Sequence, residues 1–189
     1  MNIIISPYDE DTYYFRSDST FIRAITDYYI PDYVRDMSVT PMLIFRIDRA
    51  GKAISEKFAI RYFGPFTYGF LLKFTIDEKF GGSCRTFMEN SMDYSTIAPK
   101  QLEDIDKYSS FLNEDHPLLL NINGREIFRM DRNPRPTDLY RKFSIITDFC
   151  SVRTGDFLAF ELNKPTPVTC GHRLILSSGE TNFTDLIIR

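Results

Sequence analysis

The feature that most constrains the fold of this chain is a hairpin signal past its middle. Two runs rich in β-forming residues, 118–122 and 125–130, flank the dipeptide Asn123-Gly124. Asn-Gly supplies the positive φ angles that a two-residue turn between antiparallel strands requires. The pattern therefore predicts a β-hairpin and places part of the chain in an antiparallel sheet.

Other short β-forming runs predict further strands at 2–5, 12–15, 42–48, 69–74, 157–160 and 185–189. The first two, separated by Pro7, are expected to be edge strands. The alternating run 42–48 should end in a turn at Arg49-Ala50-Gly51. The run from Gly69 to Phe74 is almost wholly apolar, which is typical of a strand buried on both faces.

Two segments show helical spacing. Ser55 is a candidate N-cap for a short helix through Tyr62, and Gly64-Pro65 should stop it. A second helix is expected to start from Thr137 or Asp138 as N-cap and to end before Gly155. Its apolar face would carry Leu139, Phe143, Ile146 and Cys150. Gly81-Gly82 is interpreted as a turn.

Composition favours a single folded domain, residues 1–189. The length of 189 residues suits one sizeable core, and 43% hydrophobic with 26% charged residues is ordinary for a globular protein. Phe (17) and Tyr (11) are abundant, which favours sheet.

The net charge of −3 gives no field that would attract a phosphate backbone, so nucleic acid is not expected as a partner. Acidic neighbours and intervening Pro and Asn residues indicate a solvated loop for the one basic cluster, Arg125, Arg129, Arg132, Arg135, Arg141 and Lys142. No apolar run reaches the length of a membrane span, and the N-terminal residues lack a signal-peptide pattern, which leads us to expect a cytoplasmic protein with no membrane partner. Three scattered cysteines, Cys84, Cys150 and Cys170, indicate neither a zinc site nor a disulfide framework.

Three motifs follow one another at spacings found in a known family. They are the segment Gly51 to Tyr62, the hairpin Asn121-Ile122-Asn123-Gly124-Arg125, and the segment Ser151 to Leu158. The ending Pro167 to Leu174 extends the match. In order and spacing these motifs resemble the fumarylacetoacetate hydrolase family over roughly residues 14 to 189, in the form of a divergent, shortened member similar to bacterial 2-hydroxyhepta-2,4-diene-1,7-dioate isomerases and fumarylpyruvate hydrolases.

The resemblance implies an α+β, β-rich fold, a mixed β-sandwich or roll with a few short helices, that commonly forms homodimers. It also implies metal-dependent hydrolysis, decarboxylation, isomerisation or hydration of small oxo-acids. Such chemistry uses a hard cation, Mg²⁺, Mn²⁺ or Ca²⁺, held by carboxylates.

The positions that match the family's three metal ligands carry no carboxylate in this chain. The Glu-x-Glu pair falls on Thr40 and Met42, and the Asp of the next strand falls on Leu71. The substrate lysine of the family corresponds to Arg85, which keeps the charge but cannot act as a tunable base. The lid helix with its His-x-x-Glu pair has no counterpart before His116, and Phe160 to Asn163 replaces a Thr-Gly-Thr-Pro loop.

We therefore expect a catalytically degenerate protein with no metal or other cofactor and a binding or assembly role as a homodimer. One alternative is a residual enzyme in which Arg85 and Arg46 grip the carboxylate of a small oxo-acid and displaced acids such as Asp36, Asp48 or Asp93 hold a metal. Another is a subunit that pairs with an intact family paralogue. His116 and His172 are interpreted as loop histidines.

Overall fold

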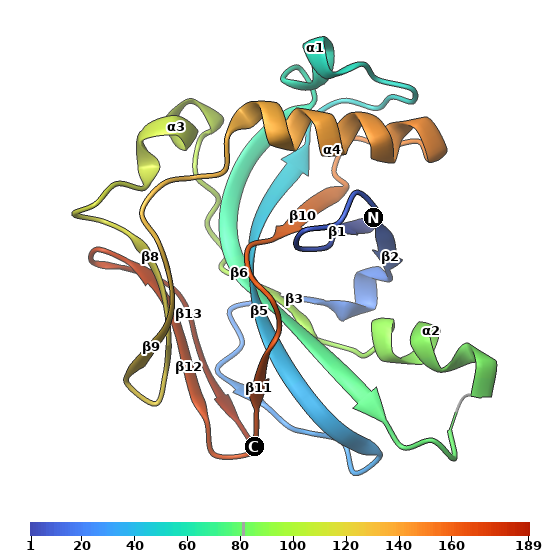
Figure 1. Ribbon diagram of the computed structural model, residues 1–189, viewed down its shortest axis with the longest axis vertical. Helices are drawn as coiled ribbons and strands as arrows, with labels where there is room; N and C mark the ends of the chain where they lie inside the picture. The colour runs from blue at the N-terminus through green and yellow to red at the C-terminus, as the bar shows by residue number, and fades with distance from the viewer. Residues whose placement is uncertain (81) are drawn as a thin grey trace.

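The structure is a computed structural model that describes residues 1–80 and 82–189. These residues form two β-sheets flanked by helices (Figure 1). The strands are β1 (Ile3–Ser6), β2 (Tyr14–Arg16), β3 (Phe21–Arg23), β4 (Asp27–Tyr28), β5 (Val34–Ile47), β6 (Phe63–Ile76), β7 (Thr96–Ala98), β8 (Leu118–Ile122), β9 (Arg125–Met130), β10 (Phe157–Glu161), β11 (Thr166–Val168), β12 (Arg173–Ser178) and β13 (Thr181–Ile188). The α-helices are α1 (Glu56–Ala59), α2 (Arg85–Asn90), α3 (Tyr108–Phe111) and α4 (Pro136–Phe149), and 3₁₀ turns lie at 18–20, 82–84 and 105–107.

One sheet has eight strands and the other has five. The larger has the order β2-β1-β10-β5-β6-β7-β3, and β11 also pairs with β5; the smaller has the order β4-β13-β12-β8-β9. Both sheets are mixed, because β1–β10, β3–β7 and β4–β13 are parallel pairs while the other pairs are antiparallel. The predicted α+β, β-rich fold class, with mixed sheets and a few short helices, is confirmed.

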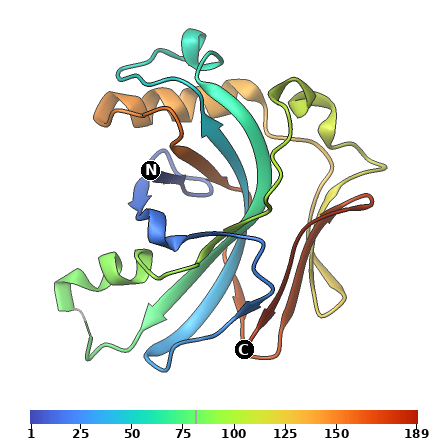
Figure 2. The same cartoon turned by 180° about the vertical axis from the view of Figure 1, so that it is seen from behind.

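Strands β5 and β6 form the bent centre of the larger sheet (Figures 1 and 2). Each has 14 residues, and both faces are buried along most of their length. Because side chains alternate along a strand, Leu43 and Phe45 pack into the large core shared with the five-stranded sheet, whereas Met42 and Ile44 face the other way. The two-sided burial explains why these strands carry near-continuous apolar sequence.

The larger sheet curls around a second, smaller core, and we call this curled sheet the roll. Phe21 of β3 stacks on Phe157 of β10 with ring centroids 4.8 Å apart, although these strands lie in opposite halves of the sheet. The buried residues of this smaller core are Ile3, Ile5, Met42, Ile44, Leu71, Ala98, Phe157 and Ala159. The roll interior is therefore lined by side chains from both halves of the sheet.

Helix α4 lies across one end of the roll (Figure 1). Its Phe143 packs against Tyr62 and Phe63, with ring centroids 5.8 and 5.1 Å apart. The helix was expected to follow Thr137 or Asp138 as N-cap, but it starts earlier. Pro136 stands in the first turn and the N-cap is Arg135, because proline has no N–H to leave unpaired and its φ already suits a helix.

The hairpin β8–β9 has the predicted strands and turn, with φ of 51° at Asn123 and 79° at Gly124. Several other strand predictions need correction. Both N-terminal strands were expected at a sheet edge. Of these two, β2 is an edge strand, whereas β1 lies between β2 and β10 in the interior of the sheet. Strand β5 begins at Val34, well before Met42, because the polar residues of its first half pair with β6 and β11.

The first predicted helix is shorter than expected, because α1 ends at Ala59 and does not reach Tyr62. Gly64 and Pro65, which were expected to stop the helix, are residues of strand β6. Of the predicted turn Gly81-Gly82, Gly81 lies outside the described residues, and Gly82 starts a 3₁₀ turn.

The basic cluster is not a single loop, which corrects the sequence interpretation. Arg125 and Arg129 lie on β9, whereas Arg141 and Lys142 lie on α4. Acidic partners hold several of the guanidinium groups, as in the pairs Arg129–Asp131, Arg132–Glu114, Arg135–Asp138 and Arg141–Asp11. All three cysteines are free thiols, and no helix in residues 1–80 or 82–189 is long and apolar enough to cross a membrane.

Candidate functional site

The three positions that sequence comparison matched to metal ligands lie together inside the roll. Thr40 of β5 pairs with Leu71 of β6, and Met42 lies two residues further along β5. Residues two apart on one strand, and residues directly opposite on its neighbour, point to the same face of a sheet. All three are fully buried, at 0% exposure.

Two of these three side chains belong to an apolar core. Met42 and Leu71 pack with Ile3, Ile5 and Phe157, among others, in the smaller core of the roll. The Oγ1 atom of Thr40 is buried and has no hydrogen-bond partner among the residues that the structure describes. One hydroxyl and two apolar side chains at these three positions supply no carboxylate ligand for a hard divalent cation.

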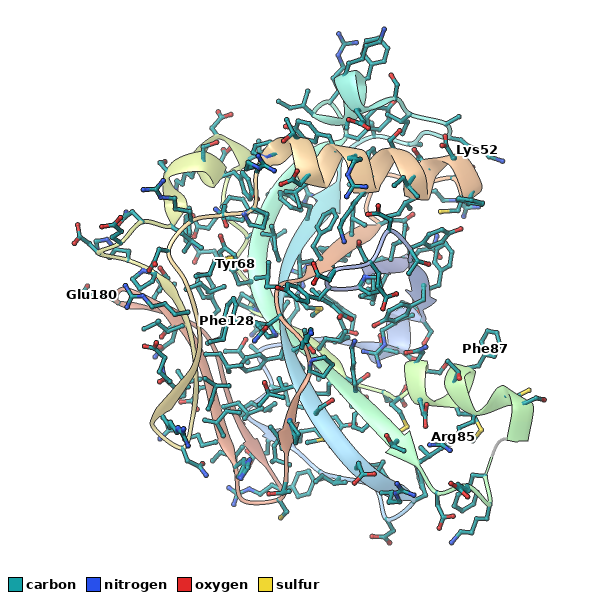
Figure 3. All side chains as sticks on the ribbon, in the orientation of Figure 1. Lys52, Tyr68, Arg85, Phe87, Phe128 and Glu180 are labelled. Atoms are coloured by element: carbon teal, nitrogen blue, oxygen red, sulfur yellow. The ribbon has the colours of Figure 1, made fainter. Side chains whose placement is uncertain are left out.

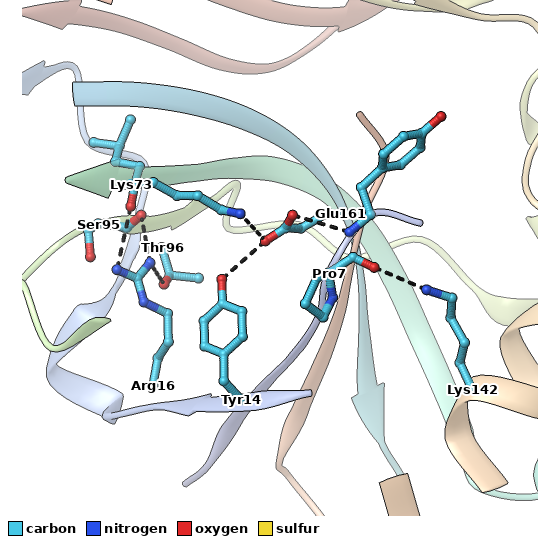
Figure 4. A network of polar contacts seen from close by, with 10 residues as sticks. Pro7, Tyr14, Arg16, Lys73, Ser95, Thr96, Lys142 and Glu161 are labelled. Carbon is cyan, nitrogen blue, oxygen red and sulfur yellow. Dashed lines mark hydrogen bonds and ion pairs between the residues drawn. The ribbon is translucent and has the colours of Figure 1, made fainter. Parts of the chain in front are cut away.

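A carboxylate, Glu161 at the end of β10, does reach this interior (Figure 4). Its side chain is 2% exposed and its Oε1 lies 2.7 Å from Nζ of Lys73 on β6. The hydroxyl of Tyr14 on β2 donates to the same oxygen over 3.1 Å, and the backbone N–H of Tyr8 donates to Oε2 over 3.3 Å. Glu161 is therefore neutralised by one ammonium and held by two further donors of the chain itself.

Arg16 of β2 adds a second buried cation beside this pair. Its guanidinium donates to the carbonyls of Asn90, Ser95 and Leu72 and to Oγ1 of Thr96, over 2.9 to 3.4 Å. These acceptors are all uncharged. Counting charges among the described side chains of this cluster, Lys73 and Arg16 face one carboxylate, so the interior carries a surplus of positive charge.

Burial dominates the acid–base behaviour of these groups. Removal from water disfavours the charged forms, which raises the pKa of Tyr14 above its usual value and lowers the pKa of Arg16 to about 10. At neutral pH Tyr14 is therefore a hydrogen-bond donor to Glu161 and Arg16 remains charged. Neither Tyr14 nor Arg16 exchanges its proton near pH 7.

Two pockets flank the Lys73–Glu161 pair. One, of about 380 Å³, is lined by Glu161 together with Tyr8, Lys142 and residues of α4. The other, of about 550 Å³, is lined by Lys73 together with Ser38, Phe74 and residues near β11. Lys142 Nζ donates to the carbonyls of Pro7 and Glu10 over 3.0 and 2.8 Å, and burial lowers its pKa.

The predicted ligand-binding arginines do not join this cluster. Arg46 lies on an exposed part of β5, where it pairs with Asp48 at 3.2 Å. Arg85 lies on α2 and pairs with Glu89 at 2.8 Å (Figure 3). Each guanidinium is thus already held by a carboxylate of its own neighbourhood, and the two stand on different elements.

The acids considered as displaced metal ligands are exposed and scattered. Asp36 pairs with Arg35, Asp48 pairs with Arg46, and Asp93 follows α2. Within residues 1–80 and 82–189 no group of three His, Cys, Asp or Glu side chains could hold a metal ion. His116 is exposed in a loop, and His172 contacts Thr169 in a turn.

The resemblance noted in the sequence implies a divalent cation inside the roll, and the residues that the structure describes there do not fit one. A hard cation needs several oxygen ligands with negative charge. The described interior offers one carboxylate, whose oxygens already accept from Lys73, Tyr14 and Tyr8, and the surplus charge of Arg16 opposes a further cation.

Sequence reasoning did not single out Lys73 or Arg16, and it treated Glu161 only as part of a replaced loop. The signal available was a charged residue set in an apolar run. Lys73 interrupts the run from Gly69 to Phe74, and Glu161 ends the run from Phe157. A charged residue in a strand that is buried on both faces requires a partner, which the sequence does not identify.

Comparisons with known proteins agree on the fold. No protein-family model matches the sequence, and neither does any curated protein. Among solved structures, the chain is similar to 2-hydroxyhepta-2,4-diene-1,7-dioate isomerase from Mycobacterium marinum, with a TM-score of 0.79 and 12% identity over 99% of this chain and 73% of that one.

The chain is also similar to fumarylpyruvate hydrolase from Pseudomonas aeruginosa, solved in complex with Mn²⁺ and pyruvate, with a TM-score of 0.76 and 10% identity over 100% of this chain and 89% of that one. A protein from Yersinia pestis CO92, described as belonging to the fumarylacetoacetate hydrolase family, matches with a TM-score of 0.74 and 15% identity over 100% of this chain and 92% of that one. The resemblance predicted from the sequence is thus confirmed for the fold, and the chain has the fold of the fumarylacetoacetate hydrolase family.

Proposed function

We propose that this protein is a divergent member of the fumarylacetoacetate hydrolase family that has lost the family's metal-dependent chemistry and acts in binding or assembly. In this proposal Thr40, Met42 and Leu71 occupy the former ligand positions. The solved structures with this fold are mostly enzymes, so the proposal rests on the residues of the site and not on the fold.

The observation that carries the proposal is the state of the roll interior. Met42 and Leu71 are packed in an apolar core, and the interior carboxylate Glu161 already accepts from three donors of the chain, Lys73, Tyr14 and the Tyr8 N–H. Replacing buried charges by apolar side chains removes the need for a cation to neutralise them, so the roll can fold without one.

The test is direct cation binding. We expect no heat when Mn²⁺ or Mg²⁺ is titrated into the protein by calorimetry, and the same melting temperature in EDTA as in excess Mn²⁺, because a ligand that binds only the folded state raises its stability by mass action. Binding at micromolar concentration or tighter would overturn the proposal. It would favour the residual enzyme, and a screen of small oxo-acid substrates would follow.

The assembly role is supported by an aromatic cluster at the edge of the roll. Tyr13 and Phe15, beside and on edge strand β2, have ring centroids 5.7 Å apart, and Phe149 at the end of α4 lies 6.2 Å from Tyr13. Phe15 is 45% exposed and Phe149 is 72% exposed. Adjacent exposed aromatics next to an open strand edge are typical of an interaction surface.

We propose that a second copy of the chain covers this aromatic cluster, since a two-fold dimer brings the same patch of both subunits together. Sedimentation of the purified protein should show a dimer, and the double variant Phe15→Ser/Phe149→Ser should shift it to a monomer. The matched control is Phe87→Ser, which removes a 77% exposed aromatic side chain on α2. A monomeric wild type contradicts the homodimer, and an intact family paralogue would then be the next partner to test. A dimer that survives the double substitution contradicts the aromatic cluster as its interface.

A further inference from the structure

The Lys73–Glu161 ion pair crosses the roll interior directly above the first of the proposed ligand positions. Lys73 of β6 is opposite Ser38 of β5, and Glu161 of β10 is opposite Met42 of β5. On this face of β5, Thr40 is the residue between Ser38 and Met42. An ion pair that joins β6 to β10 over 2.7 Å therefore spans β5 at Thr40.

We infer that the Lys73 ammonium is a built-in substitute for the divalent cation of the fold family, supplied by the chain to neutralise Glu161 inside the roll. This inference rests on the proposed function, because it assumes that the former metal position lies at Thr40, Met42 and Leu71. Beyond the proposed function, the inference names Lys73 as the group that replaces the cation. It also gives the ion pair a structural role, since Lys73 of β6 and Tyr14 of β2 both bind Glu161 of β10 (Figure 4).

The donors around Glu161 support this assignment. A buried carboxylate needs a compensating positive charge and filled hydrogen-bonding positions, whether a metal or a side chain provides them. Lys73 gives the charge, while Tyr14 and the Tyr8 N–H donate two further hydrogen bonds, so that both carboxylate oxygens have a partner. The Lys73 side chain is 30% exposed, whereas Glu161 is 2% exposed, so the ammonium reaches inward from the edge of the interior to a fixed anion.

The inference can be tested by chemical rescue, in which the side chain of Lys73 is truncated and the missing part is supplied as a free molecule. Lys73→Ala lacks the propylammonium portion of the side chain. Propylammonium chloride should therefore raise the melting temperature of Lys73→Ala by more than it raises that of the wild type, and by more than equal concentrations of sodium chloride or 1-propanol raise that of the variant. The matched control is Lys79→Ala, which removes a 68% exposed lysine paired with Asp77 at 3.1 Å.

A charge-matched double variant keeps the test valid if Lys73→Ala does not fold. Lys73→Met leaves Glu161 without its cation, whereas Lys73→Met/Glu161→Gln removes both charges. The double variant should unfold at higher urea concentration than Lys73→Met alone, or should be the only one of the two that folds. Equal stability of the single and double variants overturns the inference.

The outcomes separate this inference from the proposed function. Mn²⁺ binding by the wild-type protein overturns the proposed function and this inference together. If wild type binds no cation but Lys73→Ala behaves like Lys79→Ala and gains nothing from propylammonium, the proposed function stands and the substitute role of Lys73 is wrong.

Discussion

The guanidinium of Arg16 on β2 donates a hydrogen bond to Oγ1 of Thr96 on β7 over 3.1 Å, although β1, β10, β5 and β6 separate these two strands in the sheet order. This contact links the two halves of the curled sheet side chain to side chain. We expect Arg16→Met to lower the free energy of unfolding by about 2–4 kcal/mol, because several charge-assisted hydrogen bonds of a buried group are lost together.

Urea unfolding measures this loss, and Arg35→Met is the control. The Arg35 side chain is 63% exposed and pairs with Asp36 on the surface, so its removal should change the stability by about 0.5 kcal/mol or less. Losses of equal size in the two variants would mean that Arg16 does not hold the halves together.

Three buried tyrosines, Tyr28, Tyr68 and Tyr108, together with the partly buried Tyr14, predict instability in alkali. Burial raises the pKa of Tyr14, Tyr28, Tyr68 and Tyr108 above the ordinary value of 10, whereas the unfolded chain ionises them near 10. Because the folded state keeps protons that the unfolded state releases, stability is fully present below pH 10 and falls as the pH rises above it. In an alkaline titration, phenolate absorbance should therefore rise in two phases. The exposed tyrosines should ionise gradually, and the other four should ionise only when the protein unfolds.

Arg16 acts in the opposite direction over the same pH range, since its folded pKa of about 10 lies below its ordinary value of 12.5. The stabilisation that deprotonation of Arg16 adds with rising pH is smaller than the destabilisation from the four tyrosines, so the free energy of unfolding still falls. A protein whose folding signal is unchanged while all its tyrosines ionise near pH 10 would contradict the burial of these four side chains.

Gly69 should tolerate no side chain. A Cβ at this position would lie 2.2 Å from the carbonyl oxygen of Ile97, which belongs to the backbone of β7 and cannot move aside as a flexible side chain could. We expect Gly69→Ala to lower the free energy of unfolding by about 1–3 kcal/mol through overpacking. Gly124→Ala is the comparison, because its Cβ meets no atom within 4 Å and the cost there, about 1 kcal/mol, comes only from its φ of 79°. A Gly69→Ala variant less affected than Gly124→Ala would contradict the close packing of β6 on β7.

Restoring acids at the proposed ligand positions should restore cation affinity. Thr40→Glu, Met42→Glu and Leu71→Asp together place carboxylates on one buried face, so the triple variant should be less stable than wild type in EDTA and should regain stability in Mn²⁺. Calorimetry that finds no change in cation affinity would count against the assignment of these positions.

The same triple variant should bind Mn²⁺ more tightly when Lys73→Met is added. An ammonium inside the roll repels a divalent cation, so removing it should strengthen binding by about tenfold or more. Lys79→Met in the same background serves as the control.

Local patterns in the sequence predicted much of the fold. The Asn123-Gly124 turn specified its hairpin because few other dipeptides adopt two positive φ angles, and the two-sided apolar run after Gly69 marked the sheet centre. The full length of β5 escaped prediction, because polar residues such as Ser38 and Thr40 break the apolar pattern while their backbone still pairs with neighbouring strands. The sequence also did not predict that the β8–β9 hairpin belongs to a separate five-stranded sheet, since the other pairings of that sheet join distant segments.

The assignment of ligand positions stays a prediction. Counting along the motifs identified Thr40, Met42 and Leu71, and these positions do meet inside the roll. The partnership of Lys73, Glu161 and Tyr14 could not be read from the chain, because it joins three strands that are up to 147 residues apart in sequence. Whether a charged residue inside a strand is paired depends on strand order, which local patterns do not encode.

The parallel pairing of β1 with β10 sets an order of events during synthesis. Ile3 lies beside Phe157 and Ser6 beside Phe160, and the N–H of Asn2 donates to the Asp156 carboxylate over 2.7 Å. Strand β1 must therefore wait until β10 has been synthesised before it finds its second neighbour. Contacts of such long sequence separation make folding slow, and they leave the apolar Ile3-Ile4-Ile5 segment exposed to aggregation and to chaperones until residue 160 has emerged.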